Sequence, residues 1–138
     1  MIEFFVPGSP APQGSKRHVG HGRMIESSKA LGPWRERVAL AAHSHADGLM
    51  GGPIRIRLKF VMPRPKSTPK RTTPPAVKRP DIDKISRAIL DAITGVLIAD
   101  DSQVVDLHAT KRIAELDESH GVLIELEQLD LIRIEPTP

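Results

Sequence analysis

Residues 79–106 read RPDIDKISRAILDAITGVLIADDSQVVD, and they decide the fold of this chain. The middle of the stretch predicts a helix over residues 84–94, because apolar side chains recur there at helical spacing and Gly95 follows as a stop signal. The side chains of the expected buried stripe are Ile85, Ala88, Ile89, Ala92 and Ile93. Acidic residues stand on either side of this helix, so a core element and candidate site residues share one stretch.

Outside this stretch, alternating apolar residues predict strands. The clearest strand covers residues 54–62, where Arg55, Arg57 and Lys59 form a basic face that is either solvated or turned toward DNA. Further elements are expected as strands at 2–6, 104–112 and 121–129, the last two paired antiparallel across a turn at 115–120, and as a helix at 33–46 with Trp34 in the core. The predicted fold class is α+β, a small mixed β-sheet with two helices in a single domain over residues 1–138.

Two long segments have the composition of loops. Residues 7–26 are rich in Gly and Pro and carry Lys16 and Arg17. Residues 63–80 hold six Lys or Arg, six Pro and no acid, so we expect a flexible basic loop that contacts DNA, or alternatively a solubilising linker. The cations expected to contact DNA are Lys16 and Arg17 in the first segment and Lys66, Lys70, Arg71, Lys78 and Arg79 in the second. Residues 130–138 are expected to form a loose tail.

Charge is divided unevenly along the chain. Residues 1–80 hold 15 Lys and Arg against 4 Asp and Glu, whereas residues 81–138 hold 5 against 13. The basic half predicts a polyanionic partner, and the acidic half predicts a divalent cation. Aromatic residues make up only 3%, which disfavours nucleic-acid binding by base stacking.

Other compositional features exclude several classes of protein. The absence of cysteine excludes disulfides, thiolate zinc sites and cysteine nucleophiles. No apolar stretch approaches the roughly 20 residues that a membrane span needs, and no basic segment precedes the short apolar run at residues 2–6. We therefore expect a cytoplasmic protein with no membrane partner.

The acidic residues beside the central helix are candidate metal ligands. In an extended segment Asp81 and Asp83 point to the same side, about 6.6 Å apart along the chain, and can converge on one cation. A helix that folds back would bring Asp100 or Asp101 beside them. Arg87 follows Asp83 by one helical turn on the same side, where it can steady a carboxylate or stabilise a charged transition state.

Structural roles for the same residues remain open at this point. Asp81 or Asp83 can cap the helix, and residues 100–102 can form an ordinary turn. Arg87 can pair with Asp91 on the solvated face. A D-x-D pattern alone is weak, so spacing does not decide between a metal site and these roles.

The same stretch, residues 79–106, closely resembles the core motif of RusA-type Holliday junction resolvases. The matching elements are Asp81-Ile82-Asp83, Asp91-Ala92-Ile93 and Asp100-Asp101-Ser102-Gln103-Val104-Val105-Asp106. The opening FVPGSP at residues 5–10, followed by Lys16 and Arg17, is also similar to the family's N-terminal strand and basic loop.

The resemblance implies a homodimeric, Mg²⁺-dependent endonuclease that cuts four-way DNA junctions in recombination and repair, with Mn²⁺ as a substitute and no nucleotide cofactor. The family's catalytic carboxylates match Asp81, Asp83 and Asp101. A catalytic lysine of the family falls at Arg87, which keeps the charge but is a planar fork that cannot donate a proton. Some members have Phe where this chain has Leu90. Many relatives are carried by phages or prophages, so we expect the same setting.

Two alternatives to junction resolution stay open: an endonuclease for other branched DNA, such as flaps, and a DNA-binding homodimer without turnover. We favour a dimer because a junction presents two symmetric cleavage points to a two-fold assembly. The apolar helix residues Ile85, Ile89 and Ile93 also need burial, either within the chain or across a two-fold interface.

Overall fold

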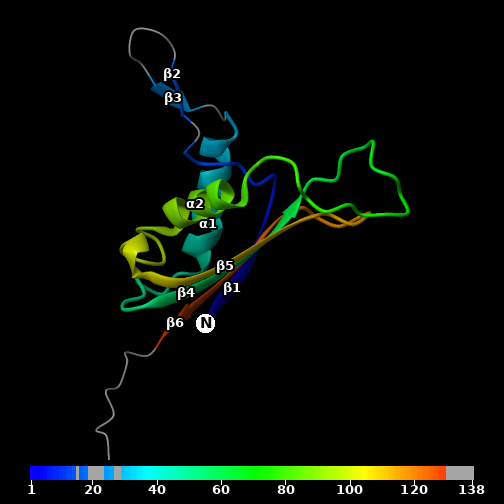
Figure 1. The fold of residues 1–138 in the computed structure, drawn as a ribbon. Coiled ribbons are helices and arrows are strands. Elements are labelled where there is room, and N and C mark those ends of the chain that lie inside the picture. The colour runs from blue at the N-terminus through cyan, green and yellow to red at the C-terminus, as the bar shows by residue number, and fades with distance from the viewer. Residues whose placement is uncertain (15, 19–23, 27–28, 130–138) are drawn as a thin grey trace, which may run out of the picture.

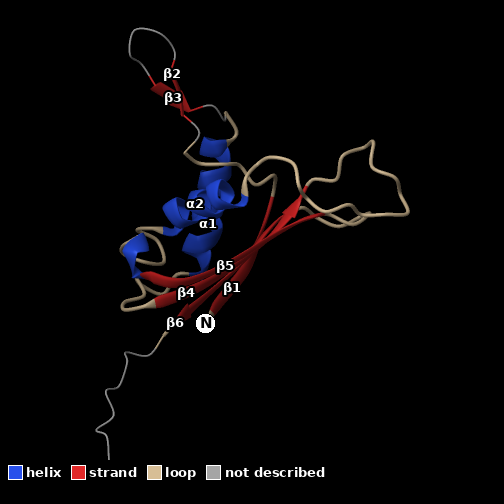
Figure 2. Cartoon of the chain, viewed as in Figure 1, coloured by secondary structure: helices blue, strands red, loops and turns tan. Residues whose placement is uncertain are grey.

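The computed structural model describes residues 1–14, 16–18, 24–26 and 29–129. Its elements are β1 (Ile2–Pro7), β2 (Lys16–His18), β3 (Met24–Glu26), α1 (Leu31–His45), β4 (Ile54–Met62), α2 (Ile82–Ile93), the short 3-10 helix η1 (Asp101–Gln103), β5 (Val104–Ile113) and β6 (Gly121–Gln128). Both α-helices cover one face of a four-stranded sheet (Figure 1; Figure 2). The predicted α+β class with a mixed sheet and two helices is confirmed. No helix in these ranges is long and apolar enough to cross a membrane.

The strand order of the main sheet is β1-β6-β4-β5. Strand β6 pairs antiparallel with β1 and β4, whereas β5 pairs parallel with β4 and forms an edge. The predicted antiparallel pairing of residues 104–112 with 121–129 is therefore wrong, because β4 lies between them. The connection from β5 crosses the end of β4, where the Ala114 N–H donates to the Met62 carbonyl at 2.9 Å.

A second, two-stranded sheet lies in the N-terminal segment for which the composition predicts a loop. Strands β2 and β3 pair antiparallel, with Lys16 opposite Glu26 and His18 opposite Met24. The loop prediction for residues 7–26 is wrong at these positions. Strands of three residues are too short to show an alternation that can be recognised among Gly and Pro.

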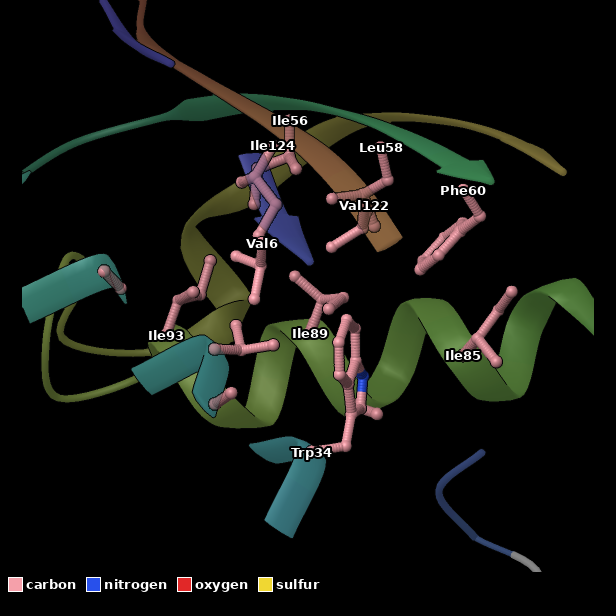
Figure 3. Close-up of a cluster of buried hydrophobic side chains, with 14 of the residues drawn as sticks. Val6, Trp34, Ile56, Leu58, Phe60, Ile85, Ile89, Ile93, Val122 and Ile124 are labelled. Atoms are coloured by element: carbon pink, nitrogen blue, oxygen red, sulfur yellow. The ribbon is translucent and has the colours of Figure 1, made fainter. Parts of the chain in front are cut away.

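The core lies between the two helices and the sheet. Ile85, Ile89 and Ile93 of α2 are fully buried and point toward residues of the central strands (Figure 3). Each such side chain contributes about 1.5–3 kcal/mol relative to full exposure. The predicted stripe of α2 is confirmed, as is the core position of Trp34. Because the chain buries these isoleucines itself, they give no argument for a dimer.

Arg64 organises the segment between β4 and α2. Its guanidinium donates to the Pro69 carbonyl at 2.6 Å, the Thr72 carbonyl at 2.5 Å and the Thr73 hydroxyl at 2.9 Å. It also reaches the Ala114 carbonyl at 3.2 Å. The segment projects beyond the end of the sheet (Figure 1). One of its six cations is therefore occupied in shaping the loop.

Candidate active site

The first acidic pair lies at the N-terminus of α2. Asp81 is the N-cap residue with extended backbone, whereas Asp83 is in the first helical turn. The predicted extended D-x-D is therefore wrong, because the helix begins at Ile82 instead of residue 84. Asp81 makes no side-chain capping hydrogen bond, and its nearest cation is the Lys84 ammonium at 3.7 Å. Both carboxylates are exposed at the start of the helix. Asp81 is therefore not occupied by capping the helix.

Asp83 and Arg87 line one hollow of about 280 Å³ between α2 and β5. The other lining residues are Ile82, Ser86, Leu90, Leu107 and Ala109. The prediction that Asp83 and Arg87 share a side of the helix is confirmed. Within the described ranges, Arg87 forms no ion pair with Asp91 or any other acid. Arg87 is therefore exposed beside a carboxylate without being neutralised by one.

The start of the N-terminal loop lies against this hollow. The Gln13 N–H donates to the Lys84 carbonyl at 3.0 Å, and a Cβ added at Gly14 would lie 3.3 Å from Arg87 Nη1. The chain then enters β2, which contains Lys16 and Arg17. The side chains of these two predicted DNA contacts lie outside the described part of the chain. The backbone nevertheless connects the basic N-terminal segment directly to the α2 site.

The second acidic pair has two different environments. The Asp100 carboxylate accepts the Ser102 N–H at 2.9 Å and caps η1. This hydrogen bond lowers the pKa of Asp100 below its ordinary value. Asp101, the first residue of η1, is exposed. The turn interpretation therefore holds for Asp100, and Asp101 is the better candidate ligand of the two.

Gln103 anchors the turn that carries Asp101, a role that the sequence did not predict. Its side-chain oxygen accepts the backbone N–H groups of Ala99 and Asp100 at 2.9 and 3.0 Å. Its amide nitrogen donates to the carbonyls of Met50 and Gly52 at 2.9 and 3.0 Å. The DDSQVVD motif contains this residue, but only the structure identifies its acceptors Met50 and Gly52, which are 53 and 51 residues away.

Within one chain, the two acidic groups lie at opposite ends of α2. Asp81 precedes a helix of 12 residues, which spans about 18 Å, and Asp101 follows it. The sheet shows the same separation. Val104, which follows η1, pairs with the first residue of β4. Lys111, which contacts the segment just before Asp81, pairs with Phe60 near the end of β4. The expected fold-back that would unite Asp81, Asp83 and Asp101 is wrong. The described residues contain no group of three acidic or histidine side chains able to hold a metal.

The predicted DNA contacts of the basic loop are exposed. Lys66, Lys70, Arg71, Lys78 and Arg79 all face solvent, and the last two lie three and two residues before Asp81. The end of the loop therefore lies beside the acidic site, where a phosphate backbone could contact the loop cations and the acidic site together.

Two of the three cations on the basic face of β4, Arg55 and Lys59, are paired with acids instead. Arg55 contacts Asp106 at 2.8 Å and Glu127 at 3.4 Å, and Lys59 lies 3.7 Å from Glu125. The hydrogen bond from Arg55 lowers the pKa of Asp106. Of the two roles considered for this face, the contacts favour a solvated, charge-paired surface.

Comparison with known proteins identifies the family. The family model of endodeoxyribonuclease RusA matches residues 7–127. The chain is also similar to the uncharacterized protein YqaN of Bacillus subtilis (strain 168), with 32% identity over 126 residues, 83% of this chain and 89% of that protein. The matched region includes both acidic groups, Arg87 and the basic loop. This chain belongs to the RusA family of endodeoxyribonucleases.

Proposed function

We propose that this protein is a Mg²⁺-dependent endonuclease that resolves four-way DNA junctions by paired nicking. The observation that carries the proposal is the hollow at the start of α2, where Asp83 and Arg87 lie together and where the basic loop ends. Exposed carboxylate oxygens are the ligands that Mg²⁺ prefers. Family membership supports cleavage of DNA over other phosphodiesters.

Each part of the site has a distinct role in this proposal. Asp81, Asp83 and Asp101 would hold Mg²⁺, which supplies Lewis-acid chemistry and water activation when bound. Arg87 donates hydrogen bonds to the phosphate oxygens as negative charge develops on them. A guanidinium stays protonated, so Arg87 stabilises charge and does not transfer a proton. The exposed cations of the loop hold the neighbouring phosphates.

A homodimer would bring together the three carboxylates, which lie at opposite ends of α2 within one chain. Strand β5 is an edge strand that runs between the two acidic groups, and its Val105 and Leu107 are 65% and 43% exposed. A second copy placed antiparallel along β5 would bring Asp101 of the partner subunit toward Asp81 and Asp83. The same two-fold operation generates a second, equivalent site, which suits the two symmetric cuts of a junction.

Subunit mixing tests both the metal ligands and their distribution. Asp81→Asn and Asp101→Asn should each abolish Mg²⁺-dependent cleavage of a cruciform plasmid while retaining junction binding, because the loop cations remain. After co-refolding, half of the dimers should be mixed, and each mixed dimer should have one intact site. About a quarter of the wild-type sites should then be restored. The product should be nicked circles instead of linear plasmid.

Three results would contradict parts of this proposal. Wild-type turnover by either variant would remove that residue from the site. An inactive mixture, with mixed dimers verified by mass spectrometry, would place each complete site in a single chain. Flap DNA cut as fast as junctions, or a wild-type protein that binds without cutting, would replace junction resolution by broader cleavage or by DNA binding alone.

A further inference from the structure

Lys111 makes contacts that the proposed mechanism does not use. It lies on β5, two residues beyond Ala109 and therefore on the same face of the sheet, toward α2. Its ammonium donates to the carbonyl of Lys78 at 2.9 Å and to the carbonyl of Pro80 at 2.8 Å. These two carbonyls flank Arg79, a predicted DNA contact, and Pro80 directly precedes Asp81.

The segment that Lys111 contacts has little other support. Within the described part of the chain, residues 78–80 make no hydrogen bond to other backbone groups. Pro80 has no N–H to donate. After this segment, the Asp81 carbonyl accepts the N–H groups of Lys84 and Ile85 in α2, both at 3.1 Å. The backbone at Asp81 is thus held by α2 after it and by Lys111 before it.

We infer that Lys111 is a positioning residue that orients Asp81 for metal binding and fixes the basic loop relative to the site. The inference rests on the proposed function for its consequence, but its structural part is independent of activity. A half-buried ammonium with two carbonyl partners makes charge-assisted hydrogen bonds, which are stronger than neutral ones. Groups that orient metal ligands typically change metal affinity by about 10–100-fold when removed.

The variants Lys111→Met, Lys111→Arg and Lys59→Met separate positioning from general effects of charge. Met keeps the apolar stem and removes the donors, whereas Arg restores donors. Lys59 is the matched control, because it lies on the adjacent strand but pairs with Glu125 on the charge-paired face. Hydrogen exchange of peptides covering residues 78–84 and Mn²⁺ binding by electron paramagnetic resonance are measured without DNA, and junction affinity and cleavage are measured separately.

For Lys111→Met we expect faster exchange at residues 78–84, at least about tenfold weaker Mn²⁺ binding and a higher Mg²⁺ requirement for cleavage. Junction affinity should change by less than about threefold, because the phosphate-binding cations remain. Arg should recover most of the Mn²⁺ affinity, and Lys59→Met should match the wild type. If Lys111→Met fails to fold, Lys111→Leu, which also lacks donors, takes its place with the same expected results.

Unchanged exchange and unchanged Mn²⁺ affinity in Lys111→Met would overturn the inference. Failure of Arg to recover metal binding would do so as well, because positioning requires only the donors. If the wild type bound DNA without cutting it, the proposed function would fail. The exchange difference at residues 78–84 would still test whether Lys111 holds this segment.

Discussion

The Arg87 guanidinium faces the hollow that Asp83 lines, close to the backbone of Gly14. Arg87→Ala should lower the single-turnover cleavage rate by about 10²–10³, as removal of a positioned transition-state donor does. Arg87→Lys should retain substantial activity, because the positive charge remains. Rates are measured on a synthetic junction at saturating enzyme.

Arg57→Ala is the control for Arg87, since Arg57 is exposed on the opposite face of the sheet and should be dispensable. The proposed dimer should persist in analytical ultracentrifugation for all three variants. A fully active Arg87→Ala protein would show that Arg87 is only a solvated surface residue of the helix.

Asp100 and Asp101 are adjacent but should respond differently to the same substitution. Asp100→Asn should remain active, because Asn caps a helix about as well as Asp and can still accept the Ser102 N–H. Asp101→Asn should lose Mg²⁺-dependent cleavage, because it removes the exposed carboxylate. Cleavage across a Mg²⁺ titration distinguishes the two. The reverse order of activities would show that the wrong member of the pair has been assigned to the metal.

Single residues were predictable where a local rule applied, and not where a distant partner decides. The burial of Ile85 and Ile89 follows from helical spacing, and the shared side of Asp83 and Arg87 follows from one helical turn. The two hydrogen bonds from the Gln103 amide nitrogen do not follow from any local rule, because their acceptors, the carbonyls of Met50 and Gly52, belong to the connection before β4. Such contacts exist only after the chain has folded.

At the scale of elements, the basic loop is a shaped segment with exposed cations. Replacing Lys66, Lys70, Arg71, Lys78 and Arg79 with Gln should weaken junction binding and flatten its dependence on salt. The log–log slope should fall by about 0.9 for each duplex phosphate that these side chains no longer neutralise. Arg64 is left unchanged because it holds the loop together. Affinity is measured by fluorescence anisotropy at several salt concentrations.

The double variant Arg57→Gln with Lys59→Gln serves as the control for the loop, because it removes charge from the solvated face of the sheet. Its salt slope should equal that of the wild type. An unchanged slope in the loop variant would show that the loop is only a linker between β4 and α2.

The strands of the main sheet were predictable individually, but their order was not. Period-two alternation predicted β4 over its observed residues, and it predicted β5 and β6 with boundaries one residue away. Alternation says which side of a strand is apolar and nothing about its neighbour. The parallel pairing of β4 with β5 depends on α2 as the crossover between them. That pairing separates the two acidic groups, so the site geometry could not be predicted without it.

At the scale of the whole molecule, the exposed strip of β5 should govern assembly. Val105→Glu should convert the proposed dimer to a monomer and abolish cleavage, because Val105 is 65% exposed on β5 and a charge cannot be buried unpaired at an interface. Analytical ultracentrifugation measures the mass, and far-UV circular dichroism verifies the fold. Leu40→Glu is the matched control, since Leu40 is 73% exposed on α1. A wild-type monomer that cuts junctions at the assay concentration would contradict the assembly.

The length of α2 has a consequence for substrate choice. In the proposed dimer along β5, the carboxylates at the two ends of one helix would belong to different metal sites, so the length of α2 would contribute to the distance between the two cuts. Its 12 residues span about 18 Å, and one added turn would lengthen the helix by about 5.4 Å. A fixed distance between the two proposed sites would favour branched DNA whose two scissile phosphates are equally far apart. The protein would then select its substrate by the distance between the two scissile phosphates, independently of the base sequence.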